Sequence, residues 1–471
     1  MSAAIRPSFD DFPTTFRGQC FRPGDSGYPE ARAIFNMRMN GWTPGLIARA
    51  ADSDDVVTAV RYAAKAGIPL AVKSGGHSID ALAMPDGALV VDMTNFKEIE
   101  VDAATGRARL GAGVLLGEMD AALIEHGLVV PAGTVSTTGV AGLTLGGGVG
   151  YNMRRFGATV DNLLACDVVT ADGRKVRASA EENPDLFWAL RGGGGNFGVV
   201  THFEYQAHPF PGTVSAGFIP FTLDQAPKIL AGLRSYIATA PRELSVISAL
   251  TPCPPFPFVS QDMHLTNALL LVVVYTGEPE NADSVIGDLA ALGKPMAVGV
   301  EPVPWTVANG LLDIIAPAGR RVESTGGYLA EMTDEVIEIA VNQAAAAPPP
   351  TNPMIPSATQ NFWVLSGALK DPDESATAFS RENAGWFYEV NVNWDDESDD
   401  ETYLSWAHEV FAELEPYFLP NVYMNLTHDL GAEWRKGIWG GPEKYSKLVA
   451  AKTKWDPTNM FRHNKNIEPG N

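Results

Sequence analysis

Hydrophobic and polar residues alternate in a strand, helix, strand order in the first part of the chain. The apolar run Leu46–Arg49 predicts a strand. Apolar residues recur at helical spacing within Ser53–Ala66, and Leu70–Val72 predicts a second strand. Asp52 is a residue type that caps helix N-termini, and Gly67 is a typical helix stop. This segment therefore has predicted boundaries as well as a predicted order.

The same short patterns continue to about Val200 and then change in character. Further strands are predicted at Ala88–Asp92, Arg107–Leu110, Cys166–Thr170 and Val199–Phe203, and helices at Leu115–Glu125 and Asp185–Leu190. From about Pro211 the pattern predicts strands at Leu269–Tyr275 and Asn361–Leu369, with helices at Ala282–Leu292 and Glu331–Ala346. We interpret the first part as α/β or α+β and the second as a separate α+β domain.

Two segments of biased composition interrupt the second part. The stretch Ala344–Pro353 is rich in alanine and proline, a composition typical of an interdomain linker. Because the strand pattern continues beyond it, we expect a loop inside the second domain. The acidic run Asp395–Glu401 predicts a solvated surface loop.

Composition and charge exclude several classes of protein. The chain has 471 residues, of which 45% are hydrophobic and 19% charged, typical of a globular protein with several domain cores. With 34 Lys and Arg against 56 Asp and Glu, the net charge of −22 disfavours nucleic acid and anionic membrane as partners. The three cysteines form no CxxC pair, Met1–Pro13 lacks a signal-peptide core, and no apolar stretch reaches about 20 residues. We expect a cytoplasmic protein without a metal site, and the sequence leaves its oligomeric state open.

Three glycine clusters indicate a cofactor that carries phosphate. They are Ser74–His77, Gly139–Gly150 and Gly192–Gly198. Glycine lets backbone N–H groups approach phosphates closely. The third cluster contains a GxGxxG pattern, but it follows a predicted helix and precedes a predicted strand. A Rossmann turn needs the reverse order, so we reject that interpretation.

Four blocks of the sequence carry a resemblance to a known family. They are Val72–Ser78 (VKSGGHS), Pro131–Gly150, Glu182–Val200 and Phe461–Ile467 (FRHNKNI). In order and spacing they resemble the berberine bridge enzyme-like FAD-linked oxidases of the vanillyl-alcohol oxidase/PCMH flavoprotein superfamily. The resemblance covers both halves of the chain. It implies an α+β fold in which a PCMH-type FAD-binding domain, residues 1–207 and 419–471, surrounds an inserted substrate domain, residues 208–418, with an antiparallel sheet covered by helices.

The resemblance also implies how FAD is held. His77 would bond covalently to the 8α-methyl carbon of the flavin, and its imidazole must be neutral to act as a nucleophile. The glycine-rich blocks would wrap the pyrophosphate, two valines would line the adenine side, and C-terminal asparagines would return to the flavin. The implied cofactor-binding residues are His77, Val72, Lys73, Ser74, Gly75, Gly76, Ser78, Pro131, Gly133, Thr134, Thr137, Gly139, Gly142, Gly146, Gly147, Gly150, Val199, Val200, Asn425, Asn464 and Asn466.

The chain departs from the family pattern at the second flavin link and near the site of oxygen reaction. Many members attach flavin C6 to a cysteine where this chain has Val135, so we expect a flavin attached singly, through histidine, as in bacterial members. Thr138 takes the position where a small residue accompanies ready reaction with oxygen. We therefore expect an oxidase that uses molecular oxygen.

The chain also departs from the pattern at the usual catalytic bases. The family's Tyr-x-Asn-Tyr segment ends here in Leu426, and a strand that can present a carboxylate has Asn361 instead. The remaining candidates for catalysis are Tyr423, His428, Tyr151 and His264, with Thr138 beside the flavin. Asn361 and Trp363 are the candidates for the substrate pocket.

Three hypotheses about function follow. In the first, the flavin accepts a hydride from a C–H bond of a small alcohol or amine, with oxygen as the final acceptor. In the second, the missing bases indicate a flavin-dependent oxygenase or oxidative cyclase in secondary metabolism. In the third, the chain binds flavin without catalysis.

Overall fold

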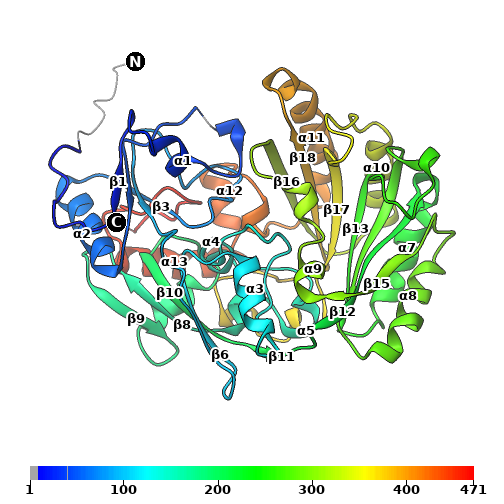
Figure 1. Cartoon of the computed structure of the whole chain (residues 1–471), viewed down its shortest axis with the longest axis horizontal. Helices are drawn as coiled ribbons and strands as arrows, with labels where there is room; N and C mark the ends of the chain where they lie inside the picture. The colour runs from blue at the N-terminus through cyan, green and yellow to red at the C-terminus, as the bar shows by residue number, and fades with distance from the viewer. Residues whose placement is uncertain (1–8, 40, 471) are drawn as a thin grey trace.

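The computed structural model describes residues 9–39 and 41–470. Most of the segment Met1–Pro13, on which the expectation about a signal peptide depends, lies outside these residues. The chain forms an N-terminal part with two main sheets, a second part built on one large sheet, and a C-terminal segment that returns to the N-terminal part (Figure 1). The fold class is α+β, as predicted.

The N-terminal part contains two sheets of different construction. The first has the order β1-β2-β4-β3, in which β2, β4 and β3 are parallel. The second is antiparallel, with the order β5-β6-β10-β8-β9. Their strands are β1 (Gln19–Phe21), β2 (Leu46–Arg49), β3 (Leu70–Lys73), β4 (Leu89–Asp92), β5 (Ile99–Asp102), β6 (Arg107–Gly111), β8 (Leu163–Val169), β9 (Lys175–Ser179) and β10 (Val199–Gln206). A small ribbon joins β7 (Leu128–Val129) to β11 (His208–Pro209), so the chain leaves this part after Pro209.

The second part is built on a seven-stranded antiparallel sheet of order β15-β12-β14-β13-β17-β18-β16. Its strands are β12 (Thr213–Thr222), β13 (Leu244–Pro252), β14 (Asn267–Tyr275), β15 (Gly299–Pro304), β16 (Arg321–Leu329), β17 (Ala358–Val364) and β18 (Trp386–Trp394). The register places Asn361 of β17 directly opposite Glu389 of β18. Side chains on one face of paired strands at such positions are direct neighbours.

Helices cover the sheets and connect the parts. The N-terminal part contains α1 (Tyr28–Arg32), α2 (Ser53–Ala66), α3 (Leu116–Ile124), α4 (Val140–Leu145), α5 (Met153–Phe156) and α6 (Pro184–Leu190). The second part contains α7 (Ala226–Ile237), α8 (Ala282–Ala290), α9 (Trp305–Asn309), α10 (Asp334–Ala345) and α11 (Asp400–Leu414), and the C-terminal segment contains α12 (Ala432–Gly437) and α13 (Pro442–Trp455). Among the described residues, no helix has the length and apolar character needed to cross a bilayer.

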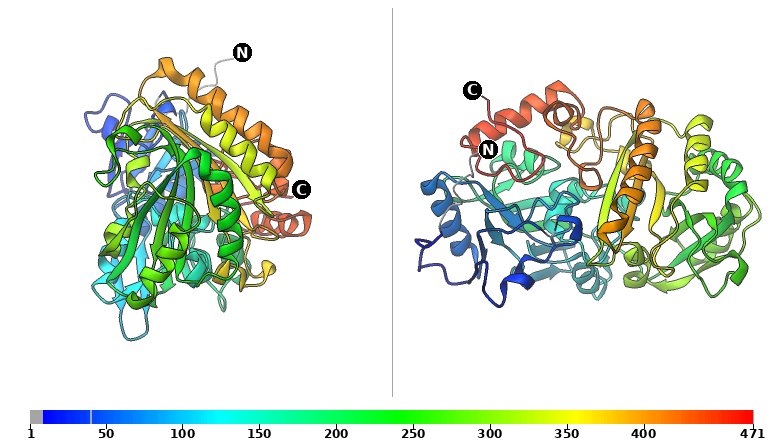
Figure 2. Two further views of the ribbon diagram at one scale, coloured as in Figure 1. Left: turned by 90° about the vertical axis from the view of Figure 1, so that its right-hand side faces the viewer. Right: turned by 90° about the horizontal axis from the view of Figure 1, so that it is seen from above.

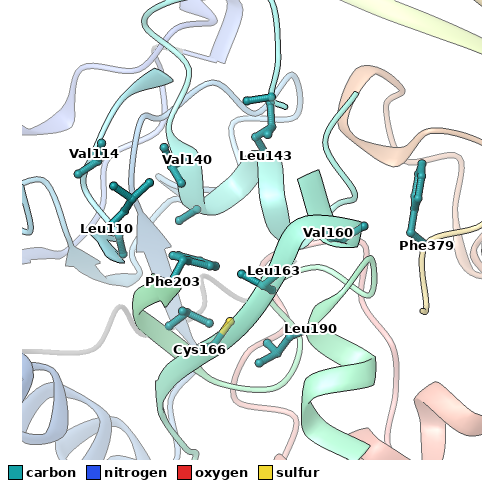
Figure 3. Packing of buried hydrophobic residues seen from close by; sticks show 14 of the residues in the cluster. Leu110, Val114, Val140, Leu143, Val160, Leu163, Cys166, Leu190, Phe203 and Phe379 are labelled. Carbon is teal, nitrogen blue, oxygen red and sulfur yellow. The ribbon is translucent and has the colours of Figure 1, made fainter. Parts of the chain in front are cut away.

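The large sheet is buried on both faces, and this explains its long apolar strands. On β14, Leu271 and Val273 pack with α7, α8, α10 and α11, whereas Val272 and Val274 belong to the core of the N-terminal part. That core surrounds β8 and β10 (Figure 3). Phe379, from the second part, also joins it and approaches Gly192 so closely that a Cβ there would lie 2.1 Å from the Phe379 backbone nitrogen.

Several predicted elements are confirmed. Helix α2 has the predicted bounds: the Asp52 side chain accepts hydrogen bonds from two backbone N–H groups of the first turn, and Gly67 ends the helix at φ 65°. The glycine cluster 192–198 lies between helix α6 and strand β10. This is the helix, glycine cluster, strand order that we predicted when rejecting a Rossmann turn. The alanine and proline stretch connects α10 to β17 and so lies inside the second part, as predicted.

Two predictions were wrong in detail. Strand β17 spans Ala358–Val364, earlier than the predicted Asn361–Leu369, because residues after Val364 turn into a 3-10 helix. The acidic run is mostly exposed to solvent, as predicted, but it forms a 3-10 turn and then the start of α11 instead of a loop. Asp400 binds Arg321 through two hydrogen bonds of 2.6 Å, and Asp395 binds the buried Arg320, so two neighbouring arginines have acidic partners here.

The C-terminal segment completes the N-terminal part. Figure 2, in the view from above, shows the C-terminal helices in red lying on the N-terminal part. The Leu70 N–H of β3 donates to the Met460 carbonyl at 3.2 Å. Lys452 of α13 is fully buried and donates to Asp456, to the Asn196 carbonyl and to the Phe461 carbonyl. The last glycine cluster and the C-terminal segment are thereby fixed together.

Asp120 connects the N-terminal part to the second part. This carboxyl lies on α3 and accepts hydrogen bonds from Trp305 Nε1 at 3.1 Å and Asn309 Nδ2 at 2.5 Å, both from α9. Burial raises its pKa to about 6, although the two hydrogen bonds act in the opposite direction. The folded protein therefore prefers the neutral carboxylic acid more than the unfolded chain does.

We expect Asp120→Asn to remove part of the pH dependence of stability. A carboxyl with a raised pKa stabilises the fold below its unfolded pKa, near 4, and this contribution is lost as the pH rises through about 6. Urea unfolding of both proteins should show the variant gaining up to about 3 kcal/mol relative to the natural protein between pH 4 and pH 7. A difference that stays constant over this range would contradict the assignment.

Candidate active site

A cavity of about 350 Å³ lies where the three segments of the chain meet. Its walls include the turn after β3, the loop 133–139 with α4, residues of β17 and β18, and the C-terminal residues 423–427 and 461–465. Most of its lining is apolar, with a few polar side chains, as in sites that bind small molecules and cofactors.

Two glycine-rich turns form one wall by approaching each other closely. A Cβ at Gly75 would lie 2.3 Å from the Gly139 backbone nitrogen, and a Cβ at Gly139 would lie 2.4 Å from that of Gly75. In contrast, a Cβ at Gly142 or Gly195, which also line the cavity, would meet nothing within 4 Å. The glycines thus bring backbone to the cavity wall and leave room beside it.

The C-terminal segment beside the cavity contains buried polar atoms that lack partners. Within the described part of the chain, His463 Nε2, Asn464 Oδ1 and Asn466 Oδ1 are buried and form no hydrogen bond. His463 and Asn464 line the cavity. Buried polar groups are rarely left unpaired, so these atoms indicate a bound group that carries hydrogen-bonding atoms. Together with the open glycine wall, they fit a large polar cofactor such as FAD.

His77 lies on the cavity wall in a fixed orientation. Its ring stacks on Phe35 with centroids 4.4 Å apart, and its Nε2 is 2.9 Å from Thr137 Oγ1. Burial lowers its pKa to about 4, and the nearby Asp313 carboxylate only partly opposes this. The imidazole is therefore neutral at physiological pH, which is the nucleophilic form.

Glu389 of β18 places a carboxyl on the cavity wall. Its Oε2 accepts hydrogen bonds from Trp363 Nε1 at 3.0 Å and Asn361 Nδ2 at 3.2 Å, and its Oε1 accepts one from Ser324 at 3.2 Å. Burial raises its pKa despite these three bonds. A carboxyl with a raised pKa beside a cavity is a typical general base or acid.

Tyr423 also lines the cavity, but it is rarely deprotonated at neutral pH. Its hydroxyl oxygen accepts hydrogen bonds from Asn425 Nδ2 at 3.1 Å and from the Val149 N–H at 3.4 Å. Burial raises its pKa to about 12. At neutral pH the hydroxyl keeps its proton, so it is suited to donate a hydrogen bond.

The other catalytic candidates lie outside the wall, except Thr138, which is part of it. Tyr151 is buried, and its hydroxyl has no hydrogen-bond partner within the described residues. His428 Nδ1 lies 2.7 Å from Glu323, whose hydrogen bond and charge raise the histidine pKa against the effect of burial. His264 bonds two carbonyls of its own loop.

Most residues implied to bind the cofactor do line the cavity. They are Val72, Ser74, Gly75, Gly76, His77, Ser78, Gly133, Thr134, Gly139, Gly142, Gly146, Val199, Val200, Asn425 and Asn464, and Trp363 of the substrate pocket joins them. The expected residues outside the wall are Lys73, Pro131, Thr137, Gly147, Gly150, Asn466 and Asn361. Among these, Thr137 contacts His77, Asn361 contacts Glu389, and Lys73 donates to the Ala31 carbonyl.

Glu389 is the residue that the sequence interpretation missed. Asn361 occupies the position where a carboxylate was sought, but the carboxylate lies opposite it on the neighbouring strand. The available signal was a single glutamate within the otherwise uncharged strand Trp386–Trp394. A charge in such a strand has no solvated position and must serve a buried role.

Comparison with protein families supports a flavin site. Residues 44–179 match a family described as FAD binding domain, and residues 422–468 match one described as berberine and berberine like. The first match contains the turn of His77, and the second contains Tyr423 and the C-terminal wall. Both matched segments contribute to the one cavity.

Individual proteins are similar along almost their whole length. (R)-6-hydroxynicotine oxidase of Paenarthrobacter nicotinovorans is 31% identical, covering 97% of this chain and 98% of its own. A FAD-linked oxidoreductase of Dictyostelium discoideum is 29% identical, covering 98% and 96%. The crystal structure of 6-hydroxy-D-nicotine oxidase from Arthrobacter nicotinovorans superposes with a TM-score of 0.84 at 26% identity, covering 98% of this chain and 100% of the other.

Proposed function

The chain belongs to the berberine bridge enzyme-like FAD-linked oxidoreductases, and on this premise we propose that it holds FAD covalently through His77 and oxidises a small alcohol or amine with oxygen as acceptor. The observation that carries the proposal is the placement of a neutral histidine and a buried carboxyl, Glu389, on the walls of one cavity. FAD supplies a two-electron acceptor that takes a hydride from the substrate and returns the electrons to oxygen.

A single covalent link is supported by the residues around His77. The ring is neutral and held in place by Phe35 and Thr137, as a nucleophile requires. Val135 also lines the cavity, and its side chain has no nucleophilic atom. These features favour the singly attached, histidyl type.

Glu389 supplies the base that the first hypothesis needs. A deprotonated Glu389 accepts the proton of the substrate hydroxyl or amine, while Tyr423, which lines the same cavity, donates a hydrogen bond. The oxygenase alternative rested on the absence of a base, so Glu389 removes its main support. Thr138 in the wall remains our reason to favour oxygen as the electron acceptor.

Much of the cavity lining is apolar. Phe35, Ile79, Leu82, Leu312 and Ile315 line the cavity. They favour a small, partly apolar substrate. The name of the hydroxynicotine oxidase places cyclic amines first in a substrate panel, followed by alcohols. Oxygen consumption with peroxide formation would support the oxidase, whereas oxygen incorporated into product would support the oxygenase.

We expect His77→Ala to abolish covalent attachment. The alanine variant lacks the imidazole that forms the bond, so acid precipitation should give a colourless pellet and an intact mass without the added FAD. The natural protein should give a yellow pellet and a mass increased by one FAD. A yellow pellet from the variant would show attachment at another residue.

A further inference from the structure

Asp313 of the second part binds the loop that contacts His77. It lies on the 3-10 helix Asp313–Ile315, directly after α9. The Ser136 backbone N–H donates to Asp313 Oδ1 at 2.7 Å, and the Ser136 hydroxyl donates to Oδ2 at 2.6 Å. Both carboxylate oxygens of Asp313 therefore accept hydrogen bonds from Ser136, which is 177 positions away in the sequence. Charge-assisted bonds of this kind are strong and fix geometry.

Ser136 adjoins the residues that form the flavin wall. Its neighbour Thr137 contacts His77 Nε2, and Thr134, Val135 and Thr138 line the cavity. The loop is held on its other side by α3, where the Leu116 and Gly117 N–H groups donate to the Thr138 and Ser136 carbonyls at 2.9 Å each. The loop therefore lies between α3 and Asp313.

The segment that carries Asp313 is itself anchored beside the cavity. Its neighbours Leu312 and Ile315 line the cavity, and α9 just before it is bound by Asp120 of α3. The Asp313 charge is near enough to His77 to oppose the effect of burial on the histidine pKa. The contact is thus part of the cavity structure.

We propose that Asp313 is a positioning residue for flavin attachment: through Ser136 it sets the loop so that Thr137 holds His77 Nε2, which leaves Nδ1 as the attacking atom. This inference rests on the proposed function, in which His77 carries the flavin. With Nε2–H donating to Thr137 Oγ1, the lone pair of the neutral ring is on Nδ1.

Covalent attachment of the flavin oxidises its 8α-methyl carbon, so the reaction needs molecular oxygen as the final electron acceptor. One C–H bond of the 8α-methyl group and the N–H bond of His77 break, and one C–N bond forms. The electron pair and both protons pass to the flavin, and molecular oxygen accepts them as hydrogen peroxide. Asp313 exchanges no atoms in this step and acts only on the geometry of His77.

The test compares Asp313→Ala with Asp313→Asn and with the control Asp371→Ala. Asparagine keeps an acceptor for the Ser136 N–H and a group that bonds its hydroxyl. Asp371 is an exposed carboxylate of the second part that pairs with Arg242. Each purified protein is incubated with excess FAD in air, and the flavin that survives acid precipitation is followed over time, together with total bound flavin and melting temperature.

We expect Asp313→Ala to attach flavin about 10- to 100-fold more slowly at similar total flavin binding, since small displacements of a reacting group have effects of this size. Asp313→Asn should stay near the natural rate, and Asp371→Ala should match it. Attachment in Asp313→Ala at the natural rate overturns the inference. If that variant does not fold, Ser136→Ala tests the inference instead. It removes only the hydrogen bond from the Ser136 hydroxyl to Asp313 and should slow flavin attachment measurably.

The experiment separates this inference from the proposed function. If the natural protein and Asp371→Ala carry no covalent flavin, the proposed attachment at His77 fails. If both carry it and Asp313→Ala and Ser136→Ala attach it equally fast, only the role of Asp313 fails.

Discussion

Replacing Glu389 by glutamine is expected to slow flavin reduction by substrate about 10²- to 10⁴-fold, the usual contribution of a general base. Glutamine keeps the size of the side chain and an oxygen that can accept from Trp363, so the cavity should keep its shape. The rate constant for flavin reduction, measured by stopped-flow absorbance without oxygen, tests this directly. Covalent flavin content should remain unchanged.

The pH dependence of the same rate identifies the group. Burial raises the pKa of Glu389, and only its deprotonated form accepts a proton, so the natural rate should rise with pH through that pKa. The glutamine variant should lose this rise. Tyr423→Phe is the matched comparison, because Tyr423 lines the same cavity. If Tyr423→Phe shows the larger loss and Glu389→Gln stays within threefold of the natural rate, the base is Tyr423.

Replacing Lys452 by methionine is expected to lower the free energy of unfolding by about 3–5 kcal/mol, as for other buried ion pairs that lose one partner. Lys452 and Asp456 are both 0% exposed and 2.7 Å apart. Without the ammonium group, the carboxylate of Asp456 stays buried, and the Asn196 and Phe461 carbonyls lose a donor. Urea unfolding followed by fluorescence measures the loss.

Lys454→Met is the control for this experiment. Lys454 lies on the same helix and pairs with Asp185 at 2.7 Å, but its side chain is 58% exposed. Exposed pairs contribute at most about 1 kcal/mol, so the variant should unfold close to the natural protein. Equal losses in the two variants would show that the burial of Lys452 is not the cause.

Local signals in the sequence predicted local structure well. The bounds of α2 follow from its apolar spacing, its Asp52 cap and the Gly67 stop, all of which lie within one segment. The rejected Rossmann pattern also depended only on neighbouring elements. The acidic run was misjudged because Arg320 and Arg321, which bind it, lie about 75 residues earlier in the chain.

The candidate site was predictable where it depends on short motifs. His77 and its glycines belong to one turn, and the family resemblance covers them. Glu389 and Asp313 depend on tertiary contacts: the first faces the cavity because of the register between β17 and β18, and the second meets Ser136 only after the two parts dock. No local pattern of hydrophobic residues encodes either contact.

The return of the C-terminal segment has a consequence for biosynthesis. On the ribosome, the turn of His77 emerges early, whereas His463 and Asn464, which also line the cavity, emerge much later. Before this segment is synthesised, the Leu70 N–H has no Met460 carbonyl to bind, and the Asn196 carbonyl has no Lys452 ammonium group to accept from. A domain generally folds as a unit, so the N-terminal part cannot complete its core before this segment has been synthesised. We therefore expect flavin to load into the complete cavity only after these C-terminal residues have been synthesised.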